Sequence, residues 1–325
     1  MTARRARALR MRAQRLTDPA RTLSELLRDV LAVQAQDVAA AGLAVRARTT
    51  GLCHADLRAA LDRGDVVRTC ALRGAVHLLH RDDAAWLVAL LGPANIARGR
   101  PRRLELGLTD ELCERALGAL REVLTEPLTR TALVDRLAGV GVALDPAGPA
   151  PSHLLAYAAN RGVVCAGETT YRPLPDPDPG HRPGLPELAR RYLRAYGPAT
   201  VEDLAAWSGL PADRVGAEFP SAELVPGGHG WRLSTADAPA LEDTVRLLGP
   251  FDTFLLGYQD RDLLLDPAHA PLVRTPGGAP APHVVVDGRV HGTWRRRDGR
   301  VVVEQFGHIP VSELDVEVES VLTWS

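Results

Sequence analysis

One pattern occurs three times in this sequence: two short helices followed by an alternating hairpin. In the first copy, residues 22–33 place apolar side chains at helical spacing, namely Leu23, Leu26, Leu27, Val30 and Leu31. Residues 57–62 form a second amphipathic piece. Residues 66–80 alternate around Arg73-Gly74, which predicts a β-hairpin with a tight turn. Helices closed by a hairpin are typical of a winged-helix unit, so we expect the chain to be built largely from such units.

The second and third copies follow the same order. Residues 109–124, 128–142 and 151–164 read as helices, with Ser152 as the expected cap of the last, and residues 162–174 supply the hairpin. Residues 188–196 form the next helix. Thr200 and Asp203 then form a variant capping box that opens a helix ending at Gly209, and residues 223–234 look like a wing.

After residue 245 the composition changes to Val-rich stretches separated by Asp287-Gly288 and Asp298-Gly299 turns. These stretches, which include residues 313–322, predict strands of a small barrel-like β domain. The fold class expected is α+β, with three tandem winged helix-turn-helix units and a C-terminal β-barrel. The expected domains are winged helices at 1–105, 106–175 and 187–244, a Pro- and Gly-rich linker at 176–186, and the barrel at 245–325.

Composition excludes several classes of protein. No apolar run approaches the roughly 20 residues that a membrane span requires, so we expect a cytoplasmic protein without membrane contact. All 39 Lys and Arg residues are Arg, which excludes lysine Schiff bases and a P-loop lysine. The four cysteines are expected to be buried in a reducing compartment; they are Cys53, Cys70, Cys113 and Cys165. No cofactor or metal site is expected.

Residues 33–37, Val-Gln-Ala-Gln-Asp, carry two amides two residues apart and then a carboxylate. Residues at i and i+2 lie on one side of an extended chain but on nearly opposite sides of a helix. If Gln34 and Gln36 act together, the preceding helix must end or distort beside them. The alternative is a structural amide pair that satisfies loose backbone groups at a helix end.

Basic residues suggest where DNA would bind, because winged helices commonly bind DNA. Arginines cluster at residues 4–15, where the chain reads as a basic helical arm, and at 98–103 and 289–300. The last cluster is a hairpin with Trp294 beside Arg295, Arg296 and Arg297. These side chains would contact phosphates and sugars or bases. Alternatively, Trp294 fills the barrel interior and the arginines form a solvated rim.

Four residues near the first hairpin are further candidates. Arg46, Arg68 and Arg73 are candidate DNA contacts, with Arg73 the best placed at the hairpin tip. Arg46 would equally serve as an ion-pair partner of Asp37. His77 is expected to be a half-buried histidine with satisfied hydrogen bonds, and a contact to the substrate is the alternative.

Several stretches, in this order, together resemble the AlkZ/YcaQ family of DNA glycosylases: LAVQAQDVAAAGLAVRAR, VVRTCALRGAVHLLHRDD, SHLLAYAANRGVV, AYGPATVEDLAAWSGL, GPFDTFLLGYQDR and VVVDGRVHGTWRR. Members unhook interstrand crosslinks or excise N7-alkylated purines, and many provide self-resistance to antibiotics. The resemblance implies three winged helices and a β-barrel in a C-shape around DNA. Cys70, Leu72 and Ala75 depart from the family pattern, which bears on substrate choice rather than on the scaffold.

The resemblance also implies site residues. Gln34-Ala35-Gln36 matches the catalytic Gln-apolar-Gln signature of the AlkZ branch, with Asp37 and His77 as auxiliary candidates. The expected DNA contacts are Arg46, Arg68, Arg73, Arg261, Arg289, Trp294, Arg295, Arg296 and Arg297. The expected activity is that of a monofunctional, monomeric, nucleoid-associated repair enzyme acting on alkylated purines in double-stranded DNA. The alternative is a non-catalytic winged-helix DNA-binding protein, either a regulator or a drug-sequestering resistance protein.

Overall fold

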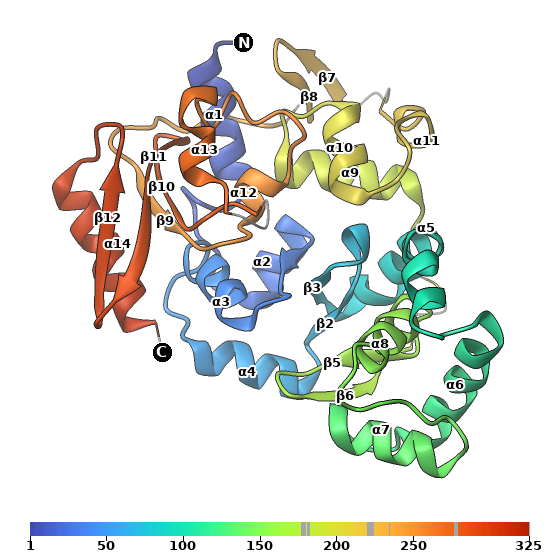
Figure 1. Ribbon diagram of the computed structural model, residues 1–325. Coiled ribbons are helices and arrows are strands. Elements are labelled where there is room, and N and C mark those ends of the chain that lie inside the picture. The colour runs from blue at the N-terminus through green and yellow to red at the C-terminus, as the bar shows by residue number, and fades with distance from the viewer. Residues whose placement is uncertain (177–179, 181–182, 220–223, 234, 276–278, 325) are drawn as a thin grey trace. The chain divides into compact units, whose positions relative to one another are not determined.

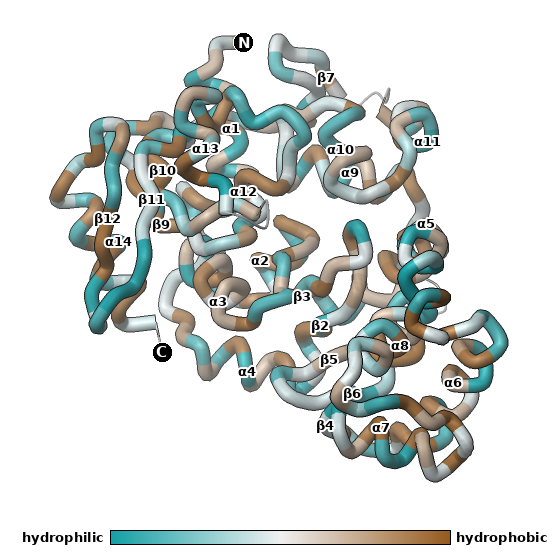
Figure 2. The backbone as a smooth tube through the Cα atoms, in the orientation of Figure 1, coloured by the Kyte–Doolittle hydropathy of each residue, from teal (hydrophilic) through white to brown (hydrophobic). Residues whose placement is uncertain are grey.

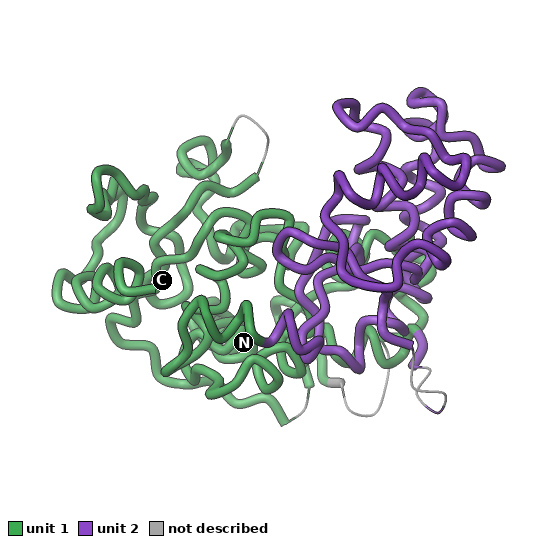
Figure 3. The backbone as a smooth tube through the Cα atoms, turned by 90° about the horizontal axis from the view of Figure 1, so that it is seen from below, with its two compact units in different colours: residues 1–59, 185–325 green, residues 60–184 purple. Residues whose placement is uncertain are grey.

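The computed structural model describes residues 1–176, 180, 183–219, 224–233, 235–275 and 279–324. They form two compact units, coloured separately in Figure 3. Unit 1 contains residues 1–59 and 185–325, and unit 2 contains residues 60–184. Unit 1 is therefore assembled from both ends of the chain. The expected linker at 176–186 falls where the chain returns to unit 1, and its residues 177–179 and 181–182 lie outside the described residues.

Unit 1 begins with three capped helices (Figure 1), which are α1 (Ala3–Ala13), α2 (Leu23–Val30) and α3 (Val38–Arg46). Each has an N-cap side chain that accepts a hydrogen bond from an amide of the first turn; the caps are Thr2, Thr22 and Asp37. The structure confirms the basic arm as a helix. It also confirms the helix expected from residue 22, although α2 ends three residues earlier than expected.

The third helix-and-hairpin copy lies entirely in unit 1. It contains α9 (Leu185–Tyr196), α10 (Val201–Ser208), α11 (Ala212–Gly216) and the strands β7 (Leu224–Gly227) and β8 (Gly230–Leu233). The Thr200–Asp203 capping box is present, and Gly209 ends α10 in the left-handed conformation at φ 78°. β7 pairs with β8 as the expected wing. Residues 223 and 234 of that expectation lie outside the described residues.

The C-terminal part of unit 1 is an open sheet, not the expected closed barrel. Its four strands run in the order β12-β11-β10-β9, and no pairing between the described residues closes the sheet. The strands are β9 (Val245–Leu248), β10 (His283–Val286), β11 (Arg289–Arg297) and β12 (Arg300–Gln305). Both Asp-Gly turns are confirmed, since Asp287 and Asp298 have φ of 46° and 49° and each precedes a glycine with positive φ.

Residues 313–322 were expected to be a strand, and this prediction is wrong because they lie in helix α14 (Val311–Thr323). The apolar residues alternate in sequence. However, the face that packs on the sheet consists of Leu314, Glu317, Val318 and Val321, which have helical spacing. Glu317 replaces an apolar residue on that face, and Val316 is left 67% exposed. Because Glu317 is a carboxylate, the sequence does not show the helical spacing of the residues on this face.

A buried ion pair joins the two chain segments of unit 1. The Arg48 guanidinium donates to both carboxylate oxygens of Asp252 at 2.8 and 2.7 Å, and both side chains are fully buried. Arg48 also donates to the Gln14 side-chain oxygen at 3.1 Å, and the Thr253 hydroxyl donates to the same oxygen at 3.0 Å. Asp252 is the N-cap of α12 (Thr253–Leu256), so this helix is held against the N-terminal segment.

Unit 2 contains the first and second hairpins in one sheet, with its own strands in the order β3-β2-β5-β6-β4. The strands are β2 (Val66–Cys70), β3 (Val76–His80), β4 (Leu128–Thr129), β5 (Val164–Ala166) and β6 (Thr170–Pro173). The helices are α5 (Arg81–Glu105), α6 (Asp110–Val123), α7 (Arg130–Gly139) and α8 (Ala150–Asn160), while α4 (His54–Arg63) leads in from unit 1. Both expected hairpins are confirmed.

Two smaller expectations are corrected. Ser152 does not cap α8, because the helix begins at Ala150 after Pro149, before the serine. Cys53 is exposed, whereas Cys70, Cys113 and Cys165 are buried as expected. In the described part of the chain, no helix is long and apolar enough to cross a membrane.

Candidate functional site

The segment with the two glutamines lies between α2 and α3, with Val33 and Gln34 in a short strand and Gln36 and Asp37 in a bend. α2 ends at Val30, and the next residue, Leu31, has a φ of 66°, which turns the chain out of the helix. The short strand β1 (Val33–Gln34) follows, and Ala32 and Val33 are fully buried. The helix therefore ends beside the glutamines, as the i, i+2 spacing requires if the two amides act together.

The two glutamines are accessible to different extents. Gln34 is half-buried, Ala35 is fully buried and Gln36 is exposed. Gln34 belongs to the strand β1, whereas Gln36 lies in a bend directly before the α3 cap. The exposed amide of Gln36 is accessible to a ligand, and that of Gln34 is partly accessible. Because a primary amide both donates and accepts hydrogen bonds, the pair can orient a water molecule.

Asp37 has a structural role. Its carboxylate accepts a hydrogen bond from the Ala40 amide at 3.1 Å and caps α3. The negative charge also lies at the N-terminus of the helix, where the helix dipole stabilises it. This cap fixes the start of α3 directly after Gln36. Asp37 thus holds the glutamine segment in place, and a role as base would compete with this hydrogen bond.

Asp37→Ala is expected to lower the free energy of unfolding by about 1 kcal/mol, because it removes the cap. Asp37→Asn keeps an accepting oxygen, so unfolding and the rate of base excision should stay close to those of the unmodified protein. Urea denaturation and a single-turnover excision assay check this. A loss of excision with normal stability in Asp37→Asn would show that the carboxylate acts as a base.

Arg46 is buried, and its ion-pair partner is not the expected Asp37. Its side chain donates to the Leu247 carbonyl at 2.5 Å and to the Glu317 carboxylate at 3.0 Å. A buried guanidinium requires such partners. Arg46 therefore connects α3 with β9 and α14, and the expected pairing with Asp37 is corrected; its contact with DNA stays a prediction that this burial does not support.

The candidates from the first hairpin belong to unit 2. Arg68 is half-buried and donates to the Gly167 carbonyl at 2.8 Å. Arg73 has a φ of 54° and lies with Gly74 in the turn Leu72–Gly74 between β2 and β3, as expected for the hairpin tip. His77 is buried, and burial lowers the pKa of its ring to about 4. Its Nδ1 lies 2.8 Å from the Ala75 carbonyl, so it is a satisfied, neutral histidine, and its burial does not support a substrate contact.

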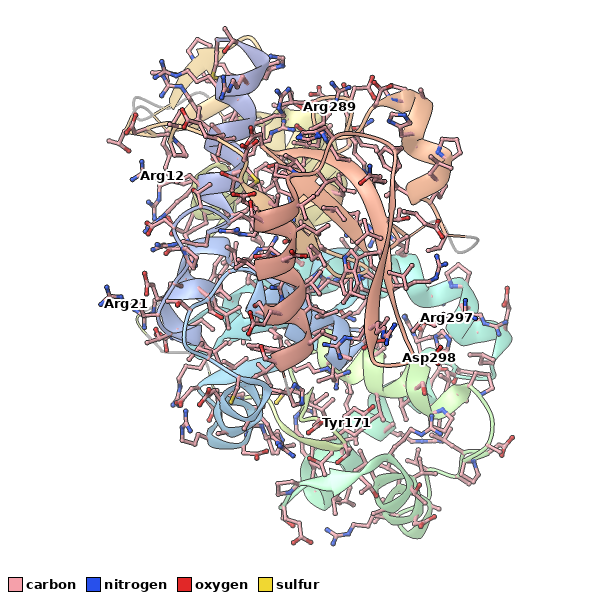
Figure 4. The ribbon with its side chains drawn as sticks, turned by 90° about the vertical axis from the view of Figure 1, so that its left-hand side faces the viewer. Arg12, Arg21, Tyr171, Arg289, Arg297 and Asp298 are labelled. Atoms are coloured by element: carbon pink, nitrogen blue, oxygen red, sulfur yellow. The ribbon has the colours of Figure 1, made fainter. Side chains whose placement is uncertain are left out.

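In the β11–β12 hairpin, the tryptophan is buried and the arginines that follow it are exposed. Trp294 is buried and donates from Nε1 to the Leu248 carbonyl at 2.9 Å, so it packs in the core against the sheet, as the alternative expectation had it. Arg295, Arg296 and Arg297 are exposed beyond it. This end of the hairpin is hydrophilic (Figure 2), and Arg297 and Asp298 lie at its tip (Figure 4).

Most arginines of the hairpin already have protein partners. Arg289 donates to Asp266 at 2.9 Å, Arg295 pairs with Glu304 across the hairpin, and Arg296 donates to the Val321 carbonyl. Arg297 lies 3.7 Å from the carboxylate of its neighbour Asp298 and is 71% exposed. Exposed ion pairs of this kind are weak, so DNA phosphates can compete for these guanidinium groups.

The other two arginine clusters are engaged in contacts within the protein to different degrees. In α1, Arg4, Arg7 and Arg10 donate to carbonyls of Leu241, Asp287 and Pro198, which attaches the helix to distant parts of unit 1. In the cluster at 98–103, Arg100 pairs with Asp110 and Arg102 pairs with Glu105, both at the surface. The N-terminal cluster therefore contributes mainly to stability.

Arg261 lies in unit 1 and lines a cavity of about 360 Å³ together with Arg274, a residue that sequence reasoning missed. Sequence reasoning also missed Arg48 and Gln14. Their partners Asp252 and Thr253 are more than 200 positions away in the chain. No local spacing signals such contacts. Among the described residues, no group of three or more His, Cys, Asp or Glu side chains is arranged to hold a metal ion.

Comparison with known proteins identifies the family. A family model described as DNA glycosylase AlkZ-like matches residues 27–324, which covers both units and the glutamine segment. This chain belongs to the AlkZ-like DNA glycosylases. It is therefore a DNA repair enzyme that hydrolyses N-glycosyl bonds, and its substrate is DNA.

Two relatives from Streptomyces sahachiroi resemble this AlkZ-like chain over nearly its whole length. One is named interstrand DNA cross-link repair glycosylase; it is 30% identical over 351 aligned positions, which cover 92% of this chain and 89% of the relative. The other is a solved structure, Streptomyces sahachiroi DNA glycosylase AlkZ. It has a TM-score of 0.83 and 26% identity, with 99% of this chain and 96% of that chain covered. The shared fold includes the segment that bears Gln34 and Gln36.

Proposed function

We propose that this AlkZ-like glycosylase excises cationic N7-alkylated purines from double-stranded DNA, with Gln34 and Gln36 positioning the attacking water. The observation that carries the proposal is the segment between α2 and α3, where the chain leaves the helix, Gln36 is exposed and Gln34 is half-buried. Asp37, the nearest carboxylate in sequence, is engaged as the α3 cap. In this proposal the two carboxamides, and not this carboxylate, orient the water.

The chemistry of the substrate explains how amides suffice. An N7-alkylguanine carries a positive charge, so the electrons of the breaking C1′–N9 bond neutralise the base, and the base leaves without a proton from the enzyme. Water forms the new bond to C1′ and releases its proton to solvent, leaving an abasic site. A glutamine carbonyl oxygen can accept a hydrogen bond from this water while a carboxamide nitrogen donates one. Holding the water beneath C1′ lowers the entropic part of the barrier.

The composition supports a monofunctional reaction. Glycosylases that also cut the strand commonly use a lysine amine as the nucleophile, and this sequence contains no lysine. Water is then the nucleophile, and the product is an intact strand with an abasic site. The amides are poor bases, so activity should be restricted to lesions whose base is already a good leaving group.

The exposed end of the β11–β12 hairpin supports the DNA-binding part of the proposal. Arg295 and Arg297 are 52% and 71% exposed, and each pairs with a surface carboxylate, that of Glu304 or Asp298. Phosphate contacts from such arginines fix the position of the protein on the duplex. Arg296 keeps its bond to the Val321 carbonyl and orients the strand. We also propose that Arg68 and Arg73 contact the backbone and that the enzyme acts as a monomer at the nucleoid.

The relative named as an interstrand cross-link repair glycosylase supports a wider substrate range. We propose that this chain unhooks crosslinks formed through two N7-alkylated purines, because each linked base is cationic and leaves by the same chemistry. A role in self-resistance to a DNA-alkylating antibiotic would follow from that substrate.

Duplex DNA with one N7-methylguanine, or with a nitrogen-mustard crosslink, tests the proposal. Incubation followed by alkaline cleavage should cut the strand at the lesion, and an otherwise identical duplex with unmodified guanine should stay intact. Strand cutting without alkali would contradict the monofunctional reaction. A protein that shifts the duplex on a gel but never releases the modified base would instead be a non-catalytic DNA-binding protein.

A further inference from the structure

A second cationic site lies in unit 1, apart from the hairpin. The cavity of about 360 Å³ lies beside α12, and α13 (Ala270–Val273) forms another part of its wall. Its apolar lining includes Leu255, Leu265 and Val273, and two guanidinium groups, from Arg261 and Arg274, line it as well. The cavity is open enough for a small anionic group to enter and reach these side chains.

Arg261 is poorly compensated for a partly buried charge. Its Nε atom is buried and has no hydrogen-bond partner within the described part of the protein. Burial lowers the pKa of Arg261, and the nearby positive charge of Arg274 lowers it further. In the described residues no carboxylate lies within ion-pair distance of either guanidinium. The two like charges thus repel each other at the partly buried end of this pair, the Arg261 guanidinium.

The carboxylates in the cavity wall do not relieve this repulsion. The Asp260 side chain accepts a hydrogen bond from the Asp262 amide at 2.8 Å and stabilises the turn after Gln259. The carboxylates of Asp260 and Asp262 are not among the groups that shift the pKa of Arg261. By contrast, nearby Arg289 is neutralised by Asp266 at 2.9 Å. The Arg261–Arg274 pair therefore lacks an anionic partner such as the one that Arg289 has.

We infer that this cavity is a phosphate-binding subsite in which Arg261 and Arg274 hold one phosphodiester of the DNA backbone. Planar guanidinium groups match the oxygens of a phosphate and can bind them in pairs, which makes arginine well suited to this role. The anion would offset the repulsion between the two charges. The inference rests on the proposed function only in that DNA supplies the phosphate, and it adds an anchoring point distinct from the glutamines.

Fluorescence anisotropy with an undamaged labelled duplex, measured over a range of salt concentrations, tests the subsite. The double variant Arg261→Ala/Arg274→Ala should bind about tenfold more weakly at low salt. The slope of log K against log salt should fall by about 1, as expected when one phosphate contact is lost. The matched control, Arg63→Ala/Arg136→Ala, removes two exposed arginines that already pair with Asp65 and Glu126. It should keep the original slope.

Further variants separate charge from folding. Arg261→Lys/Arg274→Lys keeps both charges and should retain most of the affinity. Arg274 is exposed, so Arg274→Ala alone should fold normally and show a smaller loss of affinity. If both alanine variants bind DNA with the original affinity and salt dependence, the subsite is wrong. If inorganic phosphate stabilises only the unmodified protein while DNA affinity does not change, the assignment to DNA is overturned in favour of a free phosphate.

Excision of N7-methylguanine distinguishes this inference from the proposed function. The double variant should reach half-maximal excision at a higher DNA concentration, with an unchanged single-turnover rate at saturation. If the unmodified protein excises no base but the double variant still loses DNA affinity, the subsite stands and the proposed substrate falls. If excision occurs and the variant binds normally, only the subsite falls.

Discussion

Excision of N7-methylguanine should be about 10²- to 10³-fold slower in Gln34→Ala/Gln36→Ala than in the unmodified protein. This range is typical when one group that orients or stabilises the reacting centre is removed. The amides hold the water and the sugar together, so each single variant should lose most of the activity by itself, and the two effects should not add. Single-turnover rates on a duplex with one lesion, followed by alkaline cleavage, measure the loss.

Two further measurements keep this result specific to catalysis. Gln36 is exposed and Gln34 half-buried, so the double variant should unfold at nearly the same urea concentration as the unmodified protein. Its affinity for undamaged duplex should also be unchanged, because amides contribute little to phosphate binding. A double variant that still excises the base at the original rate would show that these glutamines only support the helix end.

Arg48→Ala is expected to lower the free energy of unfolding by about 3–5 kcal/mol, the largest stability effect that the structure predicts. The substitution leaves the Asp252 carboxylate charged and fully buried without its bidentate partner. It also removes the hydrogen bond to Gln14. Urea denaturation monitored by circular dichroism, with the midpoint and slope fitted together, measures the change.

A double-mutant cycle identifies the ion pair as the cause. Arg48→Ala/Asp252→Ala should be less destabilised than the sum of the single variants, because neither charge is then left unpaired. Burial alone raises the pKa of Asp252, but the charge and hydrogen bonds of Arg48 lower it below its ordinary value. The stabilisation is therefore fully present above the ordinary carboxyl pKa and is lost as the pH falls through the lower folded value. Additive effects would show that the pair contributes nothing.

Local patterns predicted much of the fold. The β2–β3 and β5–β6 hairpins, the capping box at Thr200 and both Asp-Gly turns are confirmed, because each depends on residues within a few positions of one another. α2 ends beside the glutamines, as it must if the two amides act together, because residues at i and i+2 lie on nearly opposite sides of a helix.

The errors arose where a distant partner decides the role of a residue. Glu317 lies on the buried face of α14 because Arg46 and the Leu247 amide bind its carboxylate, and an alternating pattern from residue 313 cannot reveal that. For the same reason the sequence offered Asp37 as the ion-pair partner of Arg46, whereas the structure pairs it with Glu317. Trp294 had two readings, and only its hydrogen bond to Leu248 selects the interior one.

The glutamine motif of the candidate site could be found from the sequence, by its spacing and its resemblance to a family. Its accessibility comes from the structure, in which Gln36 is exposed and Gln34 half-buried. The Arg261–Arg274 pair was not found as a pair, because the two residues are 13 positions apart in an irregular stretch. Only the fold brings their charges into one cavity.

Unit 1 is built from two separate segments of the chain, and these are translated at different times. Arg46 and Arg48 belong to the earlier segment. Their partners Glu317 and Asp252 belong to the later one. At about 5–20 residues per second, roughly 10–40 s pass between the synthesis of Arg48 and that of Asp252. During this interval the nascent chain carries two arginines whose buried partners do not yet exist. Premature stop codons late in the message would therefore abolish the enzyme, although the glutamine motif had long been translated.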